Sequence, residues 1–339
     1  MTTSTTPADA PARHAAHDPS ATGSVARVTD PLDVGPVVLG GNVFGWTADA
    51  DASHAVLDAF VAGGGRAVDT ADAYSAWVDG HVGGESETVL GDWLAAHGAR
   101  SDVVVATKVA KLASRPGLAR DNVSAALEES LARLRTDVVD LYYAHADDAE
   151  LAPEDIAATF GALVADGRVR AWGLSNFRPD RARAVVEAAR AAGTAAPAYS
   201  QDRWSLVERG IEGDLLPTLL GLGLTELPYH ALAAGFLTGK YRPGARVDSP
   251  RAGAAGRYLE RPGALALLSV LDDVAAAHGV DVGAVALAWL RTRPGVGAPI
   301  ASARSVAQLG PILASFTLEL TADEVTRLTA ASDAVVPAS

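Results

Sequence analysis

The sequence predicts an α/β fold in which eight parallel strands and their helices close into a (β/α)8 barrel, the TIM-barrel architecture. From Val37 onward, short runs rich in β-branched residues alternate with longer amphipathic stretches. Parallel strands need crossover helices, and eight such units close a ring. A length of 339 residues suits one such barrel, and the regular alternation leaves no boundary at which to divide it into two domains.

The expected strands and helices follow one another in order along the chain. Eight short apolar runs are expected to form the strands, at 37–40, 66–69, 103–108, 138–145, 169–175, 198–201, 225–229 and 298–302. Helical patterns lie between and after them, at about 51–63, 85–97, 121–135, 153–166, 179–192, 212–221, 262–278, 281–291 and 305–314.

Local signals mark several of these boundaries. Pro153 and Pro179 each suit the first position of a helix, and acidic residues follow both of them. Thr321 and Glu324 form a capping box that opens a final helix beyond the eight repeats. Segment 234–261 is long and rich in Gly, Pro and Arg, which predicts a functional loop after the seventh strand.

The two ends of the chain differ from this pattern. Residues 1–30 are rich in Thr, Ala, Pro and Ser and predict a disordered extension, so residues 31–339 form the single barrel domain. This extension has no apolar stretch of the kind that a secretory signal requires, and a cytoplasmic protein is expected. No apolar run approaches about 18 residues, which excludes a helical membrane span.

Composition excludes several classes of function. The chain has 28 basic and 41 acidic residues, and a net charge of -13 argues against nucleic acid as a partner. With no cysteine, the chain has no disulfides, thiol nucleophiles, iron–sulfur clusters or cysteine zinc sites. Lysine occurs only at 108, 111 and 240. A retained lysine either marks a place where a compact ammonium is needed or remains by chance in a chain that uses arginine for positive charge. Lys111 receives no role.

Polar side chains are expected at the carboxyl ends of six consecutive strands, where such barrels carry their chemistry. These residues are Asp69, Lys108, His145, Ser175 with Asn176, Gln201 and Tyr229. Each alone has a structural explanation, such as a turn, a cap or a solvated edge charge. Their convergence with the nearby Tyr74 favours a catalytic mouth.

This set suits the protonation of a carbonyl oxygen. A tyrosine has a pKa of about 10, and the ammonium of Lys108 is expected to lower the pKa of Tyr74. Asp69 would hold Lys108 charged, and His145 would donate a hydrogen bond to a developing oxyanion. No side chain supplies hydride, so carbonyl reduction requires a nicotinamide cofactor.

The sequence offers no Rossmann-type glycine motif and no set of residues with the spacing of metal ligands. Gly40, Gly41 and Gly45 do not form a G-x-G-x-x-G turn that opens a helix, and a flexible turn at the barrel mouth is the better interpretation. His145 is followed by Asp147 and Asp148, but no second histidine lies nearby at ligand spacing. No metal site is therefore expected.

Several motifs in one order resemble the aldo-keto reductases, from about Val37 to Asp333. They are DTADAYS at 69–75, GGESETVLGDWL at 83–94, VVVATK at 103–108, VVDLYYAH at 138–145, WGLSNF at 172–177, GFLTGKY at 235–241 and APIASARSVAQL at 298–309. The resemblance implies a barrel that binds NADPH in an extended form across its mouth, without a Rossmann unit.

The resemblance also implies roles for individual residues. It assigns a catalytic tetrad to Asp69, Tyr74, Lys108 and His145, with Tyr74 as general acid. It assigns the nicotinamide carboxamide to Ser175, Asn176 and Gln201, and ring stacking to Tyr229. The cofactor contacts implied in full are Gly41, Asn42, Asp69, Ser175, Asn176, Gln201, Tyr229, His230, Leu232, Gly235, Lys240, Ser302, Ala303, Arg304 and Gln308. Among them Arg304 would favour NADPH over NADH through the 2′-phosphate.

The sequence departs from the family pattern around the cofactor. His230 and Ala231 replace a serine and a proline after the stacking tyrosine, and Pro311 and Ile312 replace an acidic residue and an asparagine near the adenine.

Four aromatic residues fall on loops at the expected mouth: Phe44, Trp46, Trp77 and Trp204. They are expected either to line an apolar pocket for a bulky substrate or to be ordinary loop packing. The expected partner is a small-molecule carbonyl, either a keto-sugar or specialised metabolite or an aromatic aldehyde. The alternative is a cofactor-binding regulatory or sensor protein with little turnover. The reaction direction and homo-oligomer formation stay open.

Overall fold

The computed structural model describes residue 1 and residues 32–98, 100 and 102–335. The disordered extension expected at residues 1–30 lies outside the described residues, apart from residue 1. Within the described part, no helix combines the length and apolar character needed to cross a bilayer.

The strands form one parallel sheet in the order β7-β6-β5-β4-β3-β2-β1-β8. They are β1 (Val38–Gly40), β2 (Ala67–Asp69), β3 (Val104–Val109), β4 (Val139–Ala144), β5 (Val169–Ser175), β6 (Tyr199–Gln201), β7 (Thr225–Glu226) and β8 (Ile300–Ala301). Two backbone hydrogen bonds join its outer edges: Ile300 donates to Pro228, and Glu226 donates to Gly295, both at 2.8 Å. The predicted (β/α)8 barrel is confirmed.

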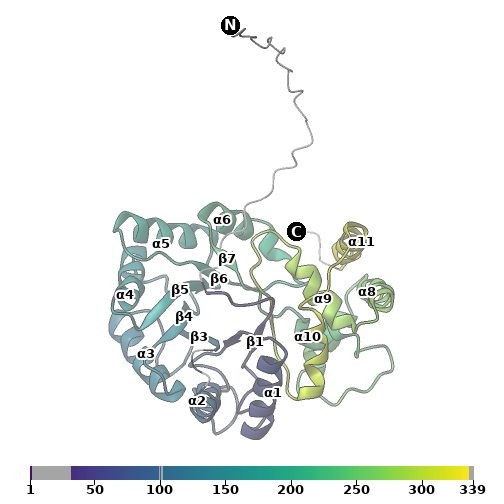
Figure 1. Ribbon diagram of the computed structural model, residues 1–339, viewed down its shortest axis with the longest axis horizontal. Coiled ribbons are helices and arrows are strands. Elements are labelled where there is room, and N and C mark those ends of the chain that lie inside the picture. The colour runs from purple at the N-terminus through teal and green to yellow at the C-terminus, as the bar shows by residue number, and fades with distance from the viewer. Residues whose placement is uncertain (2–31, 99, 101, 336–339) are drawn as a thin grey trace.

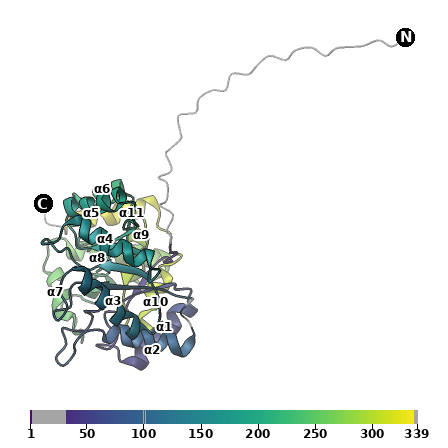
Figure 2. The ribbon, with the colours of Figure 1, turned by 90° about the vertical axis from the view of Figure 1, so that its left-hand side faces the viewer.

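Helices surround these strands (Figure 1). They are α1 (Ala50–Ala62), α2 (Glu85–His97), α3 (Arg120–Leu134), α4 (Pro153–Ala165), α5 (Pro179–Ala191), α6 (Leu215–Leu222), α7 (Ala252–Leu259), α8 (Ala264–His278), α9 (Val282–Arg291), α10 (Gly310–Ala314) and α11 (Ala322–Asp333). From α1 to α6 each helix contacts the next, and the side view has α3, α4 and α5 along the outside of the sheet (Figure 2). Helix α11 packs on α8.

The predicted caps are present. Pro153 and Pro179 occupy the first positions of α4 and α5. At the start of α11 the hydroxyl of Thr321 accepts from the backbone of Glu324, and the Glu324 carboxylate accepts from the backbone of Thr321. These short-range signals depend only on neighbouring residues, so the sequence is sufficient to predict them.

Two expectations about the seventh repeat need correction. Strand β7 is shorter than the expected 225–229, although the N–H groups of Leu227 and Tyr229 still donate to Ser200 and Asp202. Pro228 has no N–H with which to pair on the side that faces β8. Segment 234–261 is not only loop: it contains most of a 3-10 turn, η3 (Ala233–Thr238), and all of α7. Helix α7 and η3 contact each other.

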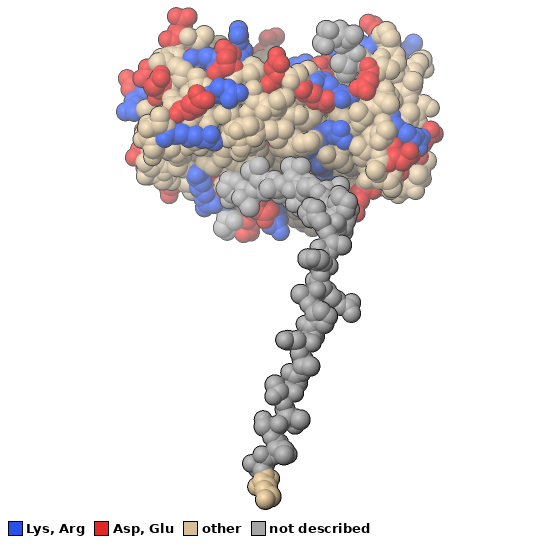
Figure 3. All heavy atoms as spheres, turned by 90° about the horizontal axis from the view of Figure 1, so that it is seen from above, with Lys and Arg blue, Asp and Glu red and all other residues tan. Residues whose placement is uncertain are grey.

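The core has two layers that follow the alternation of side chains along each strand. Leu39, Val68 and Val105 join the layer between the sheet and the helices. The barrel interior is filled by a second, smaller set of buried residues: Val34, Val38, Ala67, Ala106, Leu141, Tyr143, Tyr199, Leu227, Ala298 and Ile300. Acidic and basic side chains are mixed over one outer face (Figure 3).

Candidate active site

The same alternation aims the key polar side chains into the barrel. Asp69 lies two residues after Ala67 on β2, and Lys108 lies two residues after Ala106 on β3, so both pairs share the inward face. Gln201 bears the same relation to Tyr199 on β6. All three therefore form the top layer of the interior, and Lys108 is 0% exposed.

Lys108 is the centre of the candidate tetrad. Its ammonium donates to Asp69 Oδ2 at 2.6 Å, to the Thr70 carbonyl at 2.7 Å and to the Tyr74 hydroxyl at 2.8 Å. The Tyr74 hydroxyl donates to Asp69 Oδ2 at 3.0 Å. All three donor positions of the ammonium are used, so the buried charge is paired and fully hydrogen-bonded.

The pKa of Tyr74 moves opposite to the expected direction. The sequence predicts that Lys108 lowers it, but burial and the Asp69 carboxylate raise this pKa well above 10. Burial of Lys108 also lowers the pKa of its ammonium, and Asp69 opposes that shift. Tyr74 is thus a protonated phenol whose hydrogen bonds are already fixed.

His145 follows β4 and completes the tetrad. Its ring centroid is 6.1 Å from that of Tyr74 in an edge-to-face arrangement. Burial, and then the charges of Lys108 and Lys111, lower the pKa of His145 well below 6.5, so the imidazole is neutral at pH 7. Its Nδ1 is buried and has no hydrogen-bond partner in the described structure. Lys111, for which no role is expected from the sequence, therefore acts electrostatically on this site.

Backbone strain gathers at the same end of the barrel. Eight non-glycine residues of the described part have a positive φ. Six of them follow the carboxyl ends of strands: Ser75, Ala110, Asn176, His230, Ala233 and Ala234. Such conformations cost roughly 1–3 kcal/mol each and cluster at functional sites.

The residues expected at the nicotinamide form a connected set. The Asn176 amide donates to the His145 carbonyl at 3.0 Å and to Ser175 Oγ at 2.8 Å, and its Oδ1 accepts from the Tyr229 hydroxyl at 2.8 Å. The Ser175 hydroxyl donates to the Gln201 carbonyl at 2.7 Å. Gln201 is also bound to the tetrad, because its Nε2 donates to Asp69 Oδ1 at 2.8 Å.

The loops after β1 and β8 lie against each other. Ser302 Oγ donates to Asn42 Oδ1 at 2.7 Å, and Gln308 Oε1 accepts from the Arg304 backbone at 3.0 Å. Ala303 is buried. Gly41, expected in a flexible turn, is buried, and a Cβ there would lie 3.1 Å from the Asp69 carbonyl, so a larger residue would force its neighbours to shift.

The loop after β7 combines expected cofactor residues with one that the sequence did not single out. His230 Nε2 is 3.0 Å from the Tyr258 hydroxyl, and burial lowers the His230 pKa to about 4. Arg251 is partly buried, and its guanidinium lies 6.0 Å from the Trp46 ring centroid. Burial and the charge of Arg304 lower the pKa of Arg251. No carboxylate pairs with Arg251 in the described part of the chain.

The remaining residues of this loop frame a tight turn. Leu232 is partly buried at its start, Gly235 has a φ of 94°, and Lys240 is exposed with its ammonium 5.2 Å from the Tyr241 ring centroid. Ala233, Ala234 and Gly235 all have positive φ. Within this turn the amides of Ala233 and Gly235 donate to the carbonyls of His230 and Leu232, both at 2.8 Å.

The four expected pocket aromatics divide into two groups. Trp46 and Trp77 lie edge to face with centroids 5.5 Å apart, and Trp77 is also 6.2 Å from Tyr74. Phe44 and Trp204 are both 0% exposed members of the core, and the Trp204 indole donates to Glu212 at 2.9 Å. For Phe44 and Trp204 the packing alternative is therefore correct.

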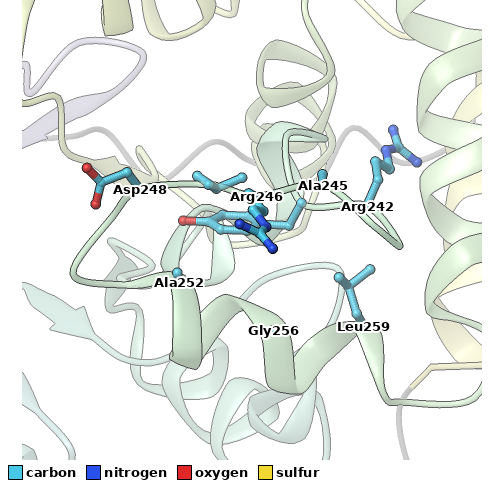
Figure 4. Close-up of a pocket in the computed structure, with 9 residues that line it drawn as sticks. Arg242, Ala245, Arg246, Asp248, Ala252, Gly256 and Leu259 are labelled. Atoms are coloured by element: carbon cyan, nitrogen blue, oxygen red, sulfur yellow. The ribbon is translucent and has the colours of Figure 1, made fainter.

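A surface pocket of about 440 Å³ is enclosed by the segment between η3 and α8 (Figure 4). Its walls include Tyr241, Arg242, Val247 and Leu259, and Arg242 is paired with Asp272. None of the tetrad residues lines it. This pocket therefore lies within the segment between η3 and α8 and is separate from the Tyr74 site. Among the described residues, no three metal-ligating side chains gather at one point.

Comparison of the sequence with known proteins supports the barrel fold. The model of the aldo/keto reductase family matches residues 36–333. The chain is 31% identical over 327 residues to Protein tas of Escherichia coli (strain K12), covering 88% of this chain and 94% of that protein. It is 30% identical over 319 residues to norsolorinic acid reductase stcV of Emericella nidulans, covering 88% and 79%.

A further bacterial relative is the uncharacterized oxidoreductase YrpG of Bacillus subtilis, 31% identical over 305 residues, which cover 85% of this chain and 89% of that protein. The barrel and its site thus define an oxidoreductase class. The chain belongs to the aldo/keto reductase family.

Proposed function

We propose that the protein is an NADPH-dependent carbonyl reductase that converts an aldehyde or ketone to an alcohol, with Tyr74 as general acid. The observation that carries this proposal is the Lys108 ammonium, which is bound at once to Asp69 Oδ2 and to the Tyr74 hydroxyl inside the barrel mouth. In this proposal Asp69, Lys108 and His145 complete the catalytic set.

When bound, the cofactor supplies hydride to the carbonyl carbon. Tyr74 keeps its proton until negative charge develops on the substrate oxygen, because its pKa is raised. An alkoxide is a stronger base than a phenolate, so transfer of the Tyr74 proton to that oxygen is then downhill. The Lys108 ammonium stabilises the phenolate left behind, since it lies 2.8 Å from the phenol oxygen.

His145 acts on the other side of the substrate oxygen. Its lowered pKa makes it a neutral imidazole, which can donate a hydrogen bond without adding a second cation beside Lys108. Asp69 neutralises Lys108 and accepts from Gln201 through its other oxygen. The chain itself therefore supplies a proton, a counter-charge and an oxyanion donor.

The residues around the mouth fit a dinucleotide with phosphate groups. Arg251 is a partly buried cation with no carboxylate partner in the described part, and burial together with the charge of Arg304 lowers its pKa. A partly buried arginine without a partner is costly unless an anion completes it. We assign Arg251 to the cofactor phosphates with the expected Arg304, Lys240, Gly235, Leu232 and His230.

The remaining cofactor contacts are proposed as expected from the sequence. Asn42, Ser302, Ala303 and Gln308 would line the β1 and β8 side, and Ser175, Asn176, Gln201 and Tyr229 the nicotinamide end. For the substrate we propose a bulky or aromatic carbonyl, because Trp46 and Trp77 present an edge-to-face aromatic pair beside Tyr74. Two relatives are named norsolorinic acid reductase, which supports reduction as the direction of the reaction.

The test is NADPH oxidation against a panel of aromatic and aliphatic aldehydes and ketones. Tyr74→Phe keeps the ring but removes the proton, and it should lower kcat by about 100-fold or more. Tyr142→Phe is the matched control, because that hydroxyl lies 3.4 Å from the Val123 carbonyl in the outer core layer. Tight NADPH binding without turnover of any carbonyl would instead favour a cofactor-binding sensor.

A further inference from the structure

Two buried carboxylic acids lie side by side at the ends of β6 and β7, outside the tetrad. Asp202 is 6% exposed and Glu226 is 0% exposed. Glu226 Oε1 accepts the backbone N–H of Asp202 at 2.8 Å. The Ser200 hydroxyl donates to Asp202 Oδ2 at 2.5 Å. The other Glu226 oxygen, Oε2, has no hydrogen-bond partner in the described structure.

Asp202 also holds the backbone of Asn176 on the neighbouring strand end. Its Oδ1 accepts the Asn176 N–H at 3.0 Å. Asn176 has a φ of 60°, a left-handed conformation that costs a non-glycine residue roughly 1–2 kcal/mol. The Asn176 side chain in turn binds the His145 carbonyl and the Tyr229 hydroxyl. A continuous set of hydrogen bonds therefore runs from Glu226 to both sides of the mouth.

We propose that Asp202 and Glu226 act together as positioning residues that fix the left-handed backbone of Asn176 and thereby orient the amide and the Tyr229 hydroxyl toward the nicotinamide end of the cofactor. This inference rests on the proposed function. Among the described residues, neither acid is hydrogen-bonded to the tetrad, so their effect on the reaction passes through Asn176.

The pair makes this positioning depend on pH. Burial raises the pKa of Asp202 to about 6, and burial together with the Asp202 charge raises the pKa of Glu226 well above 4.5. Two carboxylates this close cannot both ionise readily, so the pair holds a proton to a higher pH than an isolated acid would. Below about pH 6 Asp202 becomes neutral and binds the Asn176 N–H less strongly. Cofactor affinity should then fall.

Other charged or titratable groups face this pair from neighbouring elements. They are Lys111 after β3, Tyr143 on β4, Tyr199 on β6 and Arg203 and Tyr229 after β6 and β7. Burial raises the pKa values of Tyr143 and Tyr229 above 10, so neither changes charge between pH 5 and 8. Lys111 lowers the pKa of Asp202 and opposes the effect of burial.

The experiment measures the Kd of NADP⁺ by quenching of tryptophan fluorescence between pH 5 and 8. Asp202→Asn keeps an acceptor but cannot ionise. It should weaken binding about fivefold at pH 7.5, as expected for one hydrogen bond made less favourable, and should remove the protein's part of the loss at low pH. Asp137→Asn is the matched control, because Asp137 is exposed and lies before β4, at the opposite end of the barrel.

A second variant keeps the proposal testable if Asp202→Asn does not fold correctly. Glu226→Ala opens space beside Asp202, so burial should penalise the Asp202 carboxylate less. Asp202 should then titrate at lower pH, and the midpoint of the binding curve should move down. Curves for Asp202→Asn that parallel wild type, or an unmoved midpoint in Glu226→Ala, would overturn the positioning pair and leave the proposed function standing. Failure of wild type to bind NADP⁺ at any pH would overturn both.

Discussion

Gln201 Nε2 donates a hydrogen bond to Asp69 Oδ1 at 2.8 Å, across the barrel interior from β6 to β2. The other oxygen of the same carboxylate accepts from Lys108 at 2.6 Å. Strands β2 and β6 are not neighbours in the sheet, so this contact exists only because the sheet is curled. Gln201 therefore fixes the tetrad carboxylate in addition to its expected place at the cofactor.

Substitution of this residue should produce a pH-dependent defect. In Gln201→Glu, a protonated acid can still donate to Asp69 at low pH, whereas an ionised one repels it. We expect kcat/KM to fall about tenfold more at pH 8 than at pH 6. Gln201→Met removes the donor without adding charge, and its loss should be equal at both pH values. Identical pH–rate profiles for the two variants would contradict this role.

Asp72, in the loop after β2, should limit stability at high pH. It is 1% exposed and neither carboxylate oxygen has a hydrogen-bond partner in the described structure. Burial and the charge of Glu87 raise its pKa from 3.8 to about 7. The folded state thus holds this proton up to a higher pH than the unfolded state, and Asp72 costs stability increasingly as pH rises from about 4 to about 7.

Asp72→Asn removes that cost. The stability gained over wild type should be about 3 kcal/mol larger at pH 8 than at pH 5, because each pKa unit corresponds to about 1.4 kcal/mol. Urea unfolding at the two pH values measures it. Asp79→Asn, at an exposed position of the same loop, is the control and should show no such difference. A pH-independent effect at position 72 would show that Asp72 is ionised throughout.

Arg251 should contribute to the binding of the cofactor phosphates. Arg251→Met keeps an unbranched side chain of similar bulk near Trp46 but removes the charge. We expect the Kd of NADP⁺ to rise about tenfold and its dependence on salt to weaken. Arg257→Met is the control, since Arg257 is exposed on the same helix, α7. Equal NADP⁺ affinity in the two variants would remove Arg251 from the site.

Trp77 should select the substrate and not the cofactor. It is 53% exposed and packs edge to face against Trp46 beside Tyr74. Trp77→Ala should raise the KM for aromatic carbonyls about tenfold and leave the Kd of NADP⁺ unchanged, as expected for loss of one aromatic contact. Val82→Ala, on the same loop and 78% exposed, is the control. An unchanged KM would place the substrate elsewhere.

The sequence predicts the repeats and the tetrad because both depend on local pattern. Alternation along β2 and β3 places Asp69 and Lys108 on the inward face, and the barrel rule places them at the mouth. The sequence gives the wrong direction for the pKa of Tyr74, because it shows that Lys108 is near but not that burial and Asp69 outweigh its charge. It also does not identify Arg251. Residue spacing along segment 234–261 does not show that Arg251, just before α7, lies near Trp46 and Arg304.

By itself, the sequence determined the (β/α)8 fold, the family and the identities of the residues at the strand ends, because periodicity and motif order are properties of the chain. Only the tertiary structure decided which of them touch. In the folded protein Phe44 and Trp204 are buried, and Gln201 donates a hydrogen bond to Asp69. Glu226 accepts the backbone N–H of Asp202. The physical reason is that burial and through-space charge depend on neighbours brought together by closure of the barrel, often more than 100 residues apart, as with the 132 that separate Gln201 from Asp69.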